Sequence, residues 1–146
     1  AICGDVSHSR VAGSDMQIFS RLGAKVRVIA PPFLMPNKFP ASGIETFTSL
    51  EDGLPGGDVV MMLRNQKERM NDDLIPSDAA FHRQYGLTHE RLALANKNAM
   101  VMHPAPMNRG VEISDEVADD PQRSLIFTQM RNGVPARMAV LDLLVK

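Results

Sequence analysis

Short apolar runs alternate with polar, helix-like stretches along most of the chain. The runs at residues 1–5, 25–30, 58–63 and 99–103 predict strands, and 124–128 predicts a further one. Runs of this length, bounded by turn residues, are typical of buried strands in a parallel sheet. Because helical patterns separate them, the sequence predicts an α/β domain with a Rossmann-like open parallel sheet and helices on both faces.

The intervening stretches carry helical signals of their own. Residues 11–22 place apolar side chains at helical spacing, and Gly23 is positioned to end that helix. A second helix is expected over 87–95, where Thr88 can act as the N-cap. The last helix is expected over 134–144, with its apolar residues on one side. The alternation of strand and helix therefore continues to the end of the chain.

Composition narrows the class of protein. The 146 residues fit one domain, and 16 Lys+Arg against 17 Asp+Glu leave a net charge of -1, so the chain has no strong attraction to nucleic acid or anionic membranes. A single cysteine excludes an internal disulfide framework and favours the cytoplasm. The sequence has no Cys/His spacing typical of a metal site. It also lacks the G-x-G-x-x-G and P-loop motifs that are typical of nucleotide binding. Because Ala1 begins inside a predicted strand, we expect further sequence before it.

The candidate chemistry begins where the predicted strand 58–63 ends. Arg64 follows that strand directly, and ligands of open α/β sheets bind at the carboxyl ends of the strands. A guanidinium there suits a carboxylate or a phosphate. If the chain turns helical, Glu68 meets Arg64 on one face and orients it. The alternative interpretation is a solvated surface strip with an ordinary ion pair. Arg10 lies in a comparable place, just beyond the first strand.

A family resemblance strengthens the first interpretation. It is carried by G-D-V-x-H-S-R-V-A at 4–12, A-P-P at 30–32, R-x-Q-x-E-R at 64–69, H-P-x-P-x-N-R-G-V-E-I at 103–113 and N-G-V-x-x-R-M-A-V-L at 132–141. In this order the motifs resemble the aspartate carbamoyltransferase family, specifically its second, aspartate-binding half. The sister enzymes that act on ornithine typically read H-C-L-P at the fourth motif and lack the third.

The resemblance implies a reaction without metal or organic cofactor. Carbamoyl phosphate and L-aspartate give N-carbamoyl-L-aspartate and phosphate, the second step of de novo pyrimidine (UMP) biosynthesis. Arg10 and Arg64 match the arginines that bind the two carboxylates of aspartate, and Gln66 matches a further contact. Pro104 and Ala105 match the loop near the incoming amine. Such catalysis depends on positioning and on cations, and no residue of this half is a certain catalytic group.

Other charged residues have supporting roles in the resemblance. Glu68 is expected to orient Arg64, while Arg69, Arg109 and Glu112 match positions that couple two domains during closure around the substrates. For Arg109 and Glu112 the alternative is surface ion pairing of small energetic value.

Two histidines are not assigned to catalysis. We expect His103 to be structural at its turn rather than a general base, and His8 to be an ordinary polar surface residue. The sequence also departs from many relatives: Gly13 and Asp15 make the surroundings of Arg10 less positive, and Asn65 stands where an apolar residue is common.

The resemblance covers only one of two domains. Residues 1–146 are predicted to form a single aspartate-binding domain, and the N-terminal carbamoyl-phosphate-binding domain is absent. The implied partners are L-aspartate, carbamoyl phosphate bound through the missing domain, and copies of the chain in a homotrimer, with regulatory or dihydroorotase chains as further candidates. The alternative is a non-catalytic, free-standing module that binds an acidic metabolite or pairs with a carbamoyltransferase.

Overall fold

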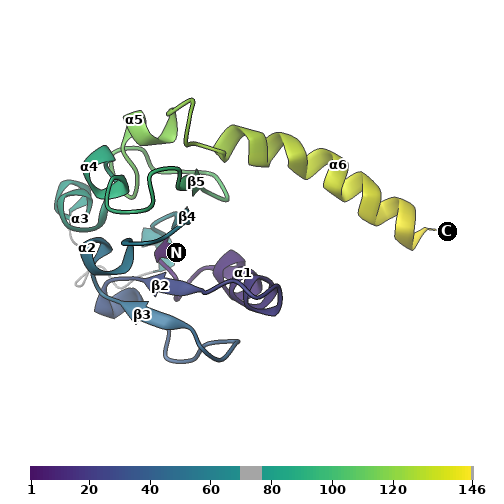
Figure 1. Ribbon diagram of the computed structural model, residues 1–146, viewed down its shortest axis with the longest axis horizontal. Helices are drawn as coiled ribbons and strands as arrows, with labels where there is room; N and C mark the ends of the chain where they lie inside the picture. The colour runs from purple at the N-terminus through teal and green to yellow at the C-terminus, as the bar shows by residue number, and fades with distance from the viewer. Residues whose placement is uncertain (70–76, 146) are drawn as a thin grey trace.

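A five-stranded parallel sheet forms the centre of the molecule (Figure 1). The computed structural model describes residues 1–69 and 77–145. The strand order is β3-β2-β1-β4-β5, and every neighbouring pair is parallel. The strands are β1 (Ile2–Gly4), β2 (Arg27–Ile29), β3 (Glu45–Phe47), β4 (Val59–Leu63) and β5 (Met100–Met102). The predicted Rossmann-like sheet is therefore confirmed, with strands shorter than the apolar runs that predicted them.

Most helices begin at a serine or threonine cap. Ser9, Ser49, Ser77, Thr88 and Ser114 each accept a hydrogen bond from a backbone N–H in the first turn, which satisfies a donor that has no partner within the helix. The α-helices are α1 (Arg10–Arg21), α2 (Leu50–Gly53), α3 (Asp78–Tyr85), α4 (His89–Leu92), α5 (Asp115–Ala118) and α6 (Ile126–Leu144), and the 3-10 helices are η1 (Pro32–Leu34) and η2 (Lys67–Arg69). The predicted Thr88 cap is confirmed.

Both faces of the sheet are apolar and covered. Successive strand residues point to opposite faces, so each strand contributes to two cores. One core contains strand residues Cys3, Val60, Met62 and Val101 with Leu50 of α2, Leu92 of α4 and Val117 of α5. The other contains Ile2, Val28, Met61 and Leu63 with Met16 of α1 and Phe81 of α3. The predicted arrangement of helices on both faces is confirmed.

The cysteine on β1 lies inside the first of these cores. Cys3 is a free thiol with 1% of its surface exposed. Because burial disfavours the charged thiolate, it raises the pKa of Cys3 from 9.0 to about 12.

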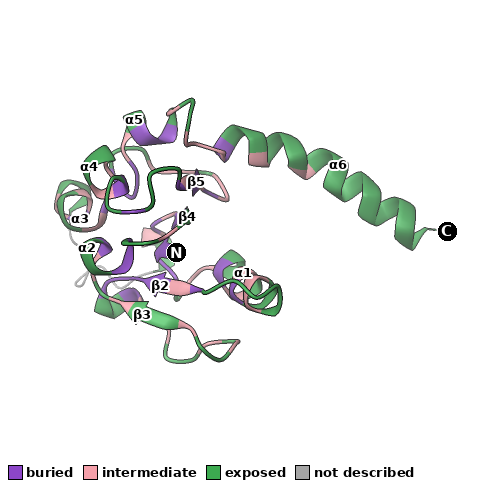
Figure 2. Ribbon diagram, in the orientation of Figure 1, coloured by how far each residue is buried: buried purple, intermediate pink, exposed green. Residues whose placement is uncertain are grey.

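Helix α6 leaves the body of the molecule as a single projecting rod (Figures 1 and 2). Ile126 at its start is buried, whereas most of the helix is exposed. Its exposed apolar residues are Phe127, Met130, Val134, Met138, Val140, Leu141, Leu143 and Leu144. None of the helices within 1–69 and 77–145 is long and apolar enough to span a membrane.

One predicted strand was wrong, and one strand was not predicted. The expected strand at 124–128 is only a bridge between Ser124 and Val101, and the helix α6 begins at Ile126. Ile126 is buried in the core and Phe127 is exposed, so the helix contacts the body of the molecule at its first residue. The strand β3 was missed because it lies at the sheet edge with Glu45 and Thr46 exposed, so it shows no apolar run.

Candidate functional site

The candidate site lies where β1 and β4 end side by side. From β1 the chain continues to β2 and β3 on one side of the sheet, and β4 and β5 follow on the other side of β1. The ends of β1 and β4 are therefore the topological switch point of the sheet. Gly4 pairs with Leu63, so the loops after both strands begin next to each other. Gly4 has a φ of 106°, and a Cβ there would lie 2.9 Å from the carbonyl oxygen of Leu63. Only glycine allows the two strand ends to approach this closely.

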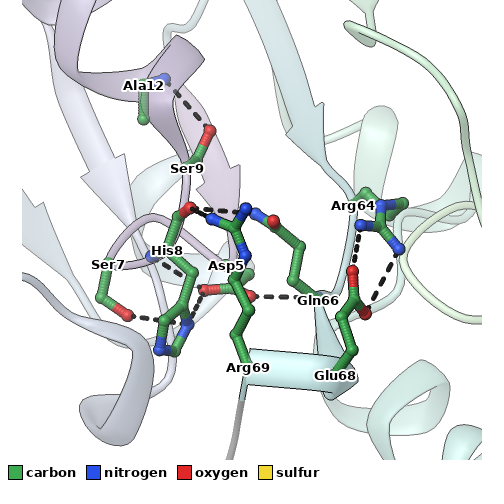
Figure 3. A network of polar contacts seen from close by, with 9 residues as sticks. All are labelled: Asp5, Ser7, His8, Ser9, Ala12, Arg64, Gln66, Glu68 and Arg69. Atoms are coloured by element: carbon green, nitrogen blue, oxygen red, sulfur yellow. Dashed lines mark hydrogen bonds and ion pairs between the residues drawn. The ribbon is translucent and has the colours of Figure 1, made fainter.

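A buried carboxylate joins the two loops (Figure 3). Asp5 is fully buried, with one oxygen 2.7 Å from Nδ1 of His8. Its other oxygen accepts a hydrogen bond from the backbone N–H of Gln66 at 3.0 Å. In return, the carbonyl of His8 accepts from Nε2 of Gln66 at 3.1 Å and from Arg69 at 3.0 Å. The description of His8 as an ordinary surface residue was wrong, because its ring and its carbonyl belong to this network.

Arg64 and Arg10 each lie two residues along the chain from a member of this network. Arg64 donates to both oxygens of Glu68, so the predicted contact between them is present (Figure 3). This hydrogen bond from Arg64 is the main reason that the pKa of Glu68 is below its usual range. Arg64 keeps 31% of its side chain exposed. Arg10 is exposed at the first position of α1, and its guanidinium has no partner among residues 1–69 and 77–145. A guanidinium in this state is available to an anionic ligand.

The loop after β5 is organised by His103, which is fully buried. Its Nδ1 lies 2.9 Å from the backbone nitrogen of Ala105, which can only donate, so Nδ1 is an acceptor. The ring proton is therefore on Nε2, which donates to Glu112 at 3.3 Å. Ala105 adopts a left-handed φ of 53°, an uncommon conformation for a residue with a Cβ. These contacts support the structural role predicted for His103.

Glu112 is fully buried and contacts both the β4 and the β5 loops. Besides His103, its carboxylate accepts from the backbone N–H of Asn108 at 2.5 Å and of Asn65 at 3.5 Å. Asn108 donates its side-chain amide to the carbonyl of Asn65 at 3.2 Å. The side chain of Asn65 is only 2% exposed, and neither its nitrogen nor its oxygen has a partner within the described part of the chain. Sequence reasoning noted Asn65 but did not connect it with Glu112.

Unlike Glu112, Arg109 forms its ion pairs with the neighbouring helix α5 and the residue that follows it. It pairs with Asp115 at 2.9 Å and with Asp119 at 2.7 Å on the surface. The hydrogen bond from Arg109 lowers the pKa of Asp119 below its usual range. Pro104 and Ala105 are half-buried in the loop after β5. No cluster of metal-ligating side chains is found in 1–69 and 77–145.

Comparison with known proteins identifies the domain. The family model "Aspartate/ornithine carbamoyltransferase, Asp/Orn binding domain" matches residues 1–144. The aspartate carbamoyltransferase catalytic subunit of Granulibacter bethesdensis is 53% identical over the whole chain, and that of Rhizorhabdus wittichii is 55% identical. In both cases the match covers 46% of the relative. The chain thus spans about half the length of the curated relatives it matches.

Solved structures give the same result for the fold. Ornithine carbamoyltransferase from Pyrococcus furiosus superposes with a TM-score of 0.81 at 24% identity, over 96% of this chain and 47% of that one. Aspartate transcarbamoylase from Trypanosoma cruzi, solved with carbamoyl aspartate and phosphate, gives 0.75 at 28% identity, over 96% and 46%. The resemblance seen in the sequence is confirmed, and the chain belongs to the aspartate/ornithine carbamoyltransferase family as its Asp/Orn-binding domain.

Proposed function

We propose that this chain is the aspartate-binding half of an aspartate carbamoyltransferase, which converts carbamoyl phosphate and L-aspartate to N-carbamoyl-L-aspartate and phosphate in pyrimidine biosynthesis. The observation that carries the proposal is Arg64, held by Glu68 at the end of β4 beside the loop of β1. The names of the most similar relatives support aspartate rather than ornithine as the substrate. A guanidinium fits the side-chain carboxylate of aspartate, whereas it repels the ammonium group of ornithine.

Each residue of the proposed site has a distinct task. Arg64 and Arg10 bind the two carboxylates of aspartate, and Gln66 is held for a further polar contact by its backbone bond to Asp5. Ala105 lies in the loop that faces the incoming amine. These residues hold the amine in position for attack, which is the main contribution a protein makes to such a reaction.

The chemical step joins two substrates. The amine nitrogen of aspartate attacks the carbonyl carbon of carbamoyl phosphate, a C–N bond forms, and the C–O bond to phosphate breaks. The amine loses a proton, and the departing phosphate accepts it. Carbamoyl phosphate and the developing oxyanion are bound by an N-terminal domain outside residues 1–146. We propose that the full-length protein works in the cytoplasm as a homotrimer, with regulatory or dihydroorotase chains as further candidate partners.

A non-catalytic module is the second candidate. It is favoured by the covered sheet, which has an apolar core on each face within the described residues. Such a module would bind an acidic metabolite or pair with a separate carbamoyltransferase, and it would transfer no carbamoyl group by itself.

The test measures the amine specificity of the full-length protein that contains this chain. With carbamoyl phosphate present, we expect turnover of L-aspartate and none of L-ornithine. Comparable turnover of ornithine would contradict the assignment. Absence of both activities, together with calorimetric binding of aspartate or another dicarboxylate, would instead support the module.

A further inference from the structure

The carboxylate of Glu112 is placed to set the distance between two loops of the site. One oxygen accepts from the backbone of Asn108 and from His103, both on the β5 side. The other accepts from the backbone of Asn65, between Arg64 and Gln66 on the β4 side. Glu112 therefore contacts the peptide chain that carries the cationic side chains and the loop that carries Ala105.

We propose that Glu112 is a positioning residue for aspartate carbamoylation, acting through these two loops without touching substrate. The inference rests on the proposed function. Arg64 and Gln66 leave the chain on either side of Asn65, so a shift of this peptide moves both of them. A displacement of about 1 Å from near-attack geometry can reduce a rate by about 100-fold. The carboxylate thus aligns the group that binds aspartate with the loop that faces its amine.

The surroundings explain why a carboxylate is needed. Three donors converge on Glu112, and each requires an acceptor: the ring N–H of His103 and the backbone N–H groups of Asn65 and Asn108. The side chains of Glu112 and His103 are both inaccessible to water, which therefore cannot replace a lost partner. An apolar residue would leave all three donors unpaired. A glutamine would present an N–H group to at least one of them.

The first experiment replaces Glu112 by Gln in the full-length protein. We expect kcat/KM for aspartate to fall by about 10- to 100-fold, because the loops lose their common acceptor. The KM for carbamoyl phosphate should stay within about twofold, since that substrate is proposed to bind another domain. Glu116→Gln is the matched control, because Glu116 is exposed on α5 and the change in charge is the same. The control should behave as the wild type.

A second variant keeps the proposal testable if Glu112→Gln does not fold. Asn108→Ala removes only the side-chain bond to the carbonyl of Asn65, and Asn108 is half-buried. It should shift aspartate kinetics in the same direction, by about 3- to 10-fold, with the KM for carbamoyl phosphate unchanged. Unchanged aspartate kinetics in this variant would overturn the proposal.

Hydrogen exchange separates this inference from the proposed function. In Glu112→Gln the backbone amides of Asn65 and Asn108 should exchange faster than in the wild type, whatever reaction the protein catalyses. Wild-type protein without aspartate turnover would refute the proposed function and with it the catalytic part of the inference, while faster exchange would still identify the tie between the loops. A loss of activity that affects both substrates equally, in proportion to the unfolded fraction, would show a purely structural residue and overturn the proposal.

Discussion

The candidate site contains two groups of residues that differ in their exposure to water. The more exposed group, which we call the rim, consists of the guanidinium groups of Arg10 and Arg64. The buried group, which we call the base, consists of Asp5, Asn65, His103 and Glu112. The rim carries positive charge into solvent, whereas the base carries hydrogen bonds that hold the loops.

The difference shows how binding and architecture can be separated within a few residues. An exposed cation is hydrated and needs no partner within the protein, so it can pair with an anionic ligand. A buried polar group must be satisfied inside the protein, so it determines the path of the chain around it. Substitutions in the rim should therefore change affinity without changing stability. Substitutions in the base should change stability, and at Glu112 the kinetics with aspartate as well.

The largest expected effect is in the rim. Arg64→Ala should lower kcat/KM for aspartate by a factor that corresponds to about 2 to 5 kcal/mol of lost binding free energy, because a carboxylate loses its charge-assisted partner. The melting temperature should not change, since the pair with Glu68 is exposed. Steady-state kinetics and thermal unfolding of the full-length variant measure both quantities. Arg83→Ala on the exposed face of α3 is the control. A change confined to the affinity for carbamoyl phosphate would mean that Arg64 serves the other substrate.

An intermediate effect is expected in the base. Asn65→Leu removes a buried amide that has no partner within 1–69 and 77–145, so it should stabilise the protein by about 1 to 3 kcal/mol. The backbone N–H of residue 65 would still reach Glu112. Chemical denaturation gives the free energy of unfolding, and Asn96→Leu is the control, because the amide of Asn96 is already bonded to Asp58. Destabilisation by Asn65→Leu would show that an ordered water or a ligand satisfies this amide.

The smallest effect is expected outside the rim and the base, at Arg109. The hydrogen bond from Arg109 lowers the pKa of Asp119, so this pair stabilises the folded state above the ordinary value of 3.8 and loses its effect as the pH falls through the lower folded-state pKa. Arg109→Gln should therefore lower the melting temperature slightly at pH 7 and not at all in strong acid. Thermal unfolding across this range tests the sign. A large rise in KM for aspartate would instead support domain closure through Arg109.

The sequence was most informative where local spacing determines contact. Apolar runs predicted four of the five strands, and the spacing of Arg64 and Glu68 predicted their pair. The bonds of Asp5 to Gln66 and of Glu112 to Asn65 join residues far apart in the chain, so only the folded sheet reveals them. The family resemblance marked Arg10 and Arg64 of the rim and Glu112 of the base, because these charged residues lie in its motifs, but it did not show which residues Glu112 contacts.

The reactivity of the Cys3 thiol can be used to compare how often the sheet opens in these variants. Cys3 is the single cysteine among residues 1–146, it lies in the strand that leads to Asp5, and its pKa is raised to about 12 by burial. Alkylation at pH 8 requires the thiolate, so the folded protein should react only when β1 separates from its neighbours. The rate at which the peptide containing Cys3 is alkylated, followed by mass spectrometry, then reports how often the sheet opens. A substitution in the base should change that rate, and one in the rim should leave it unchanged.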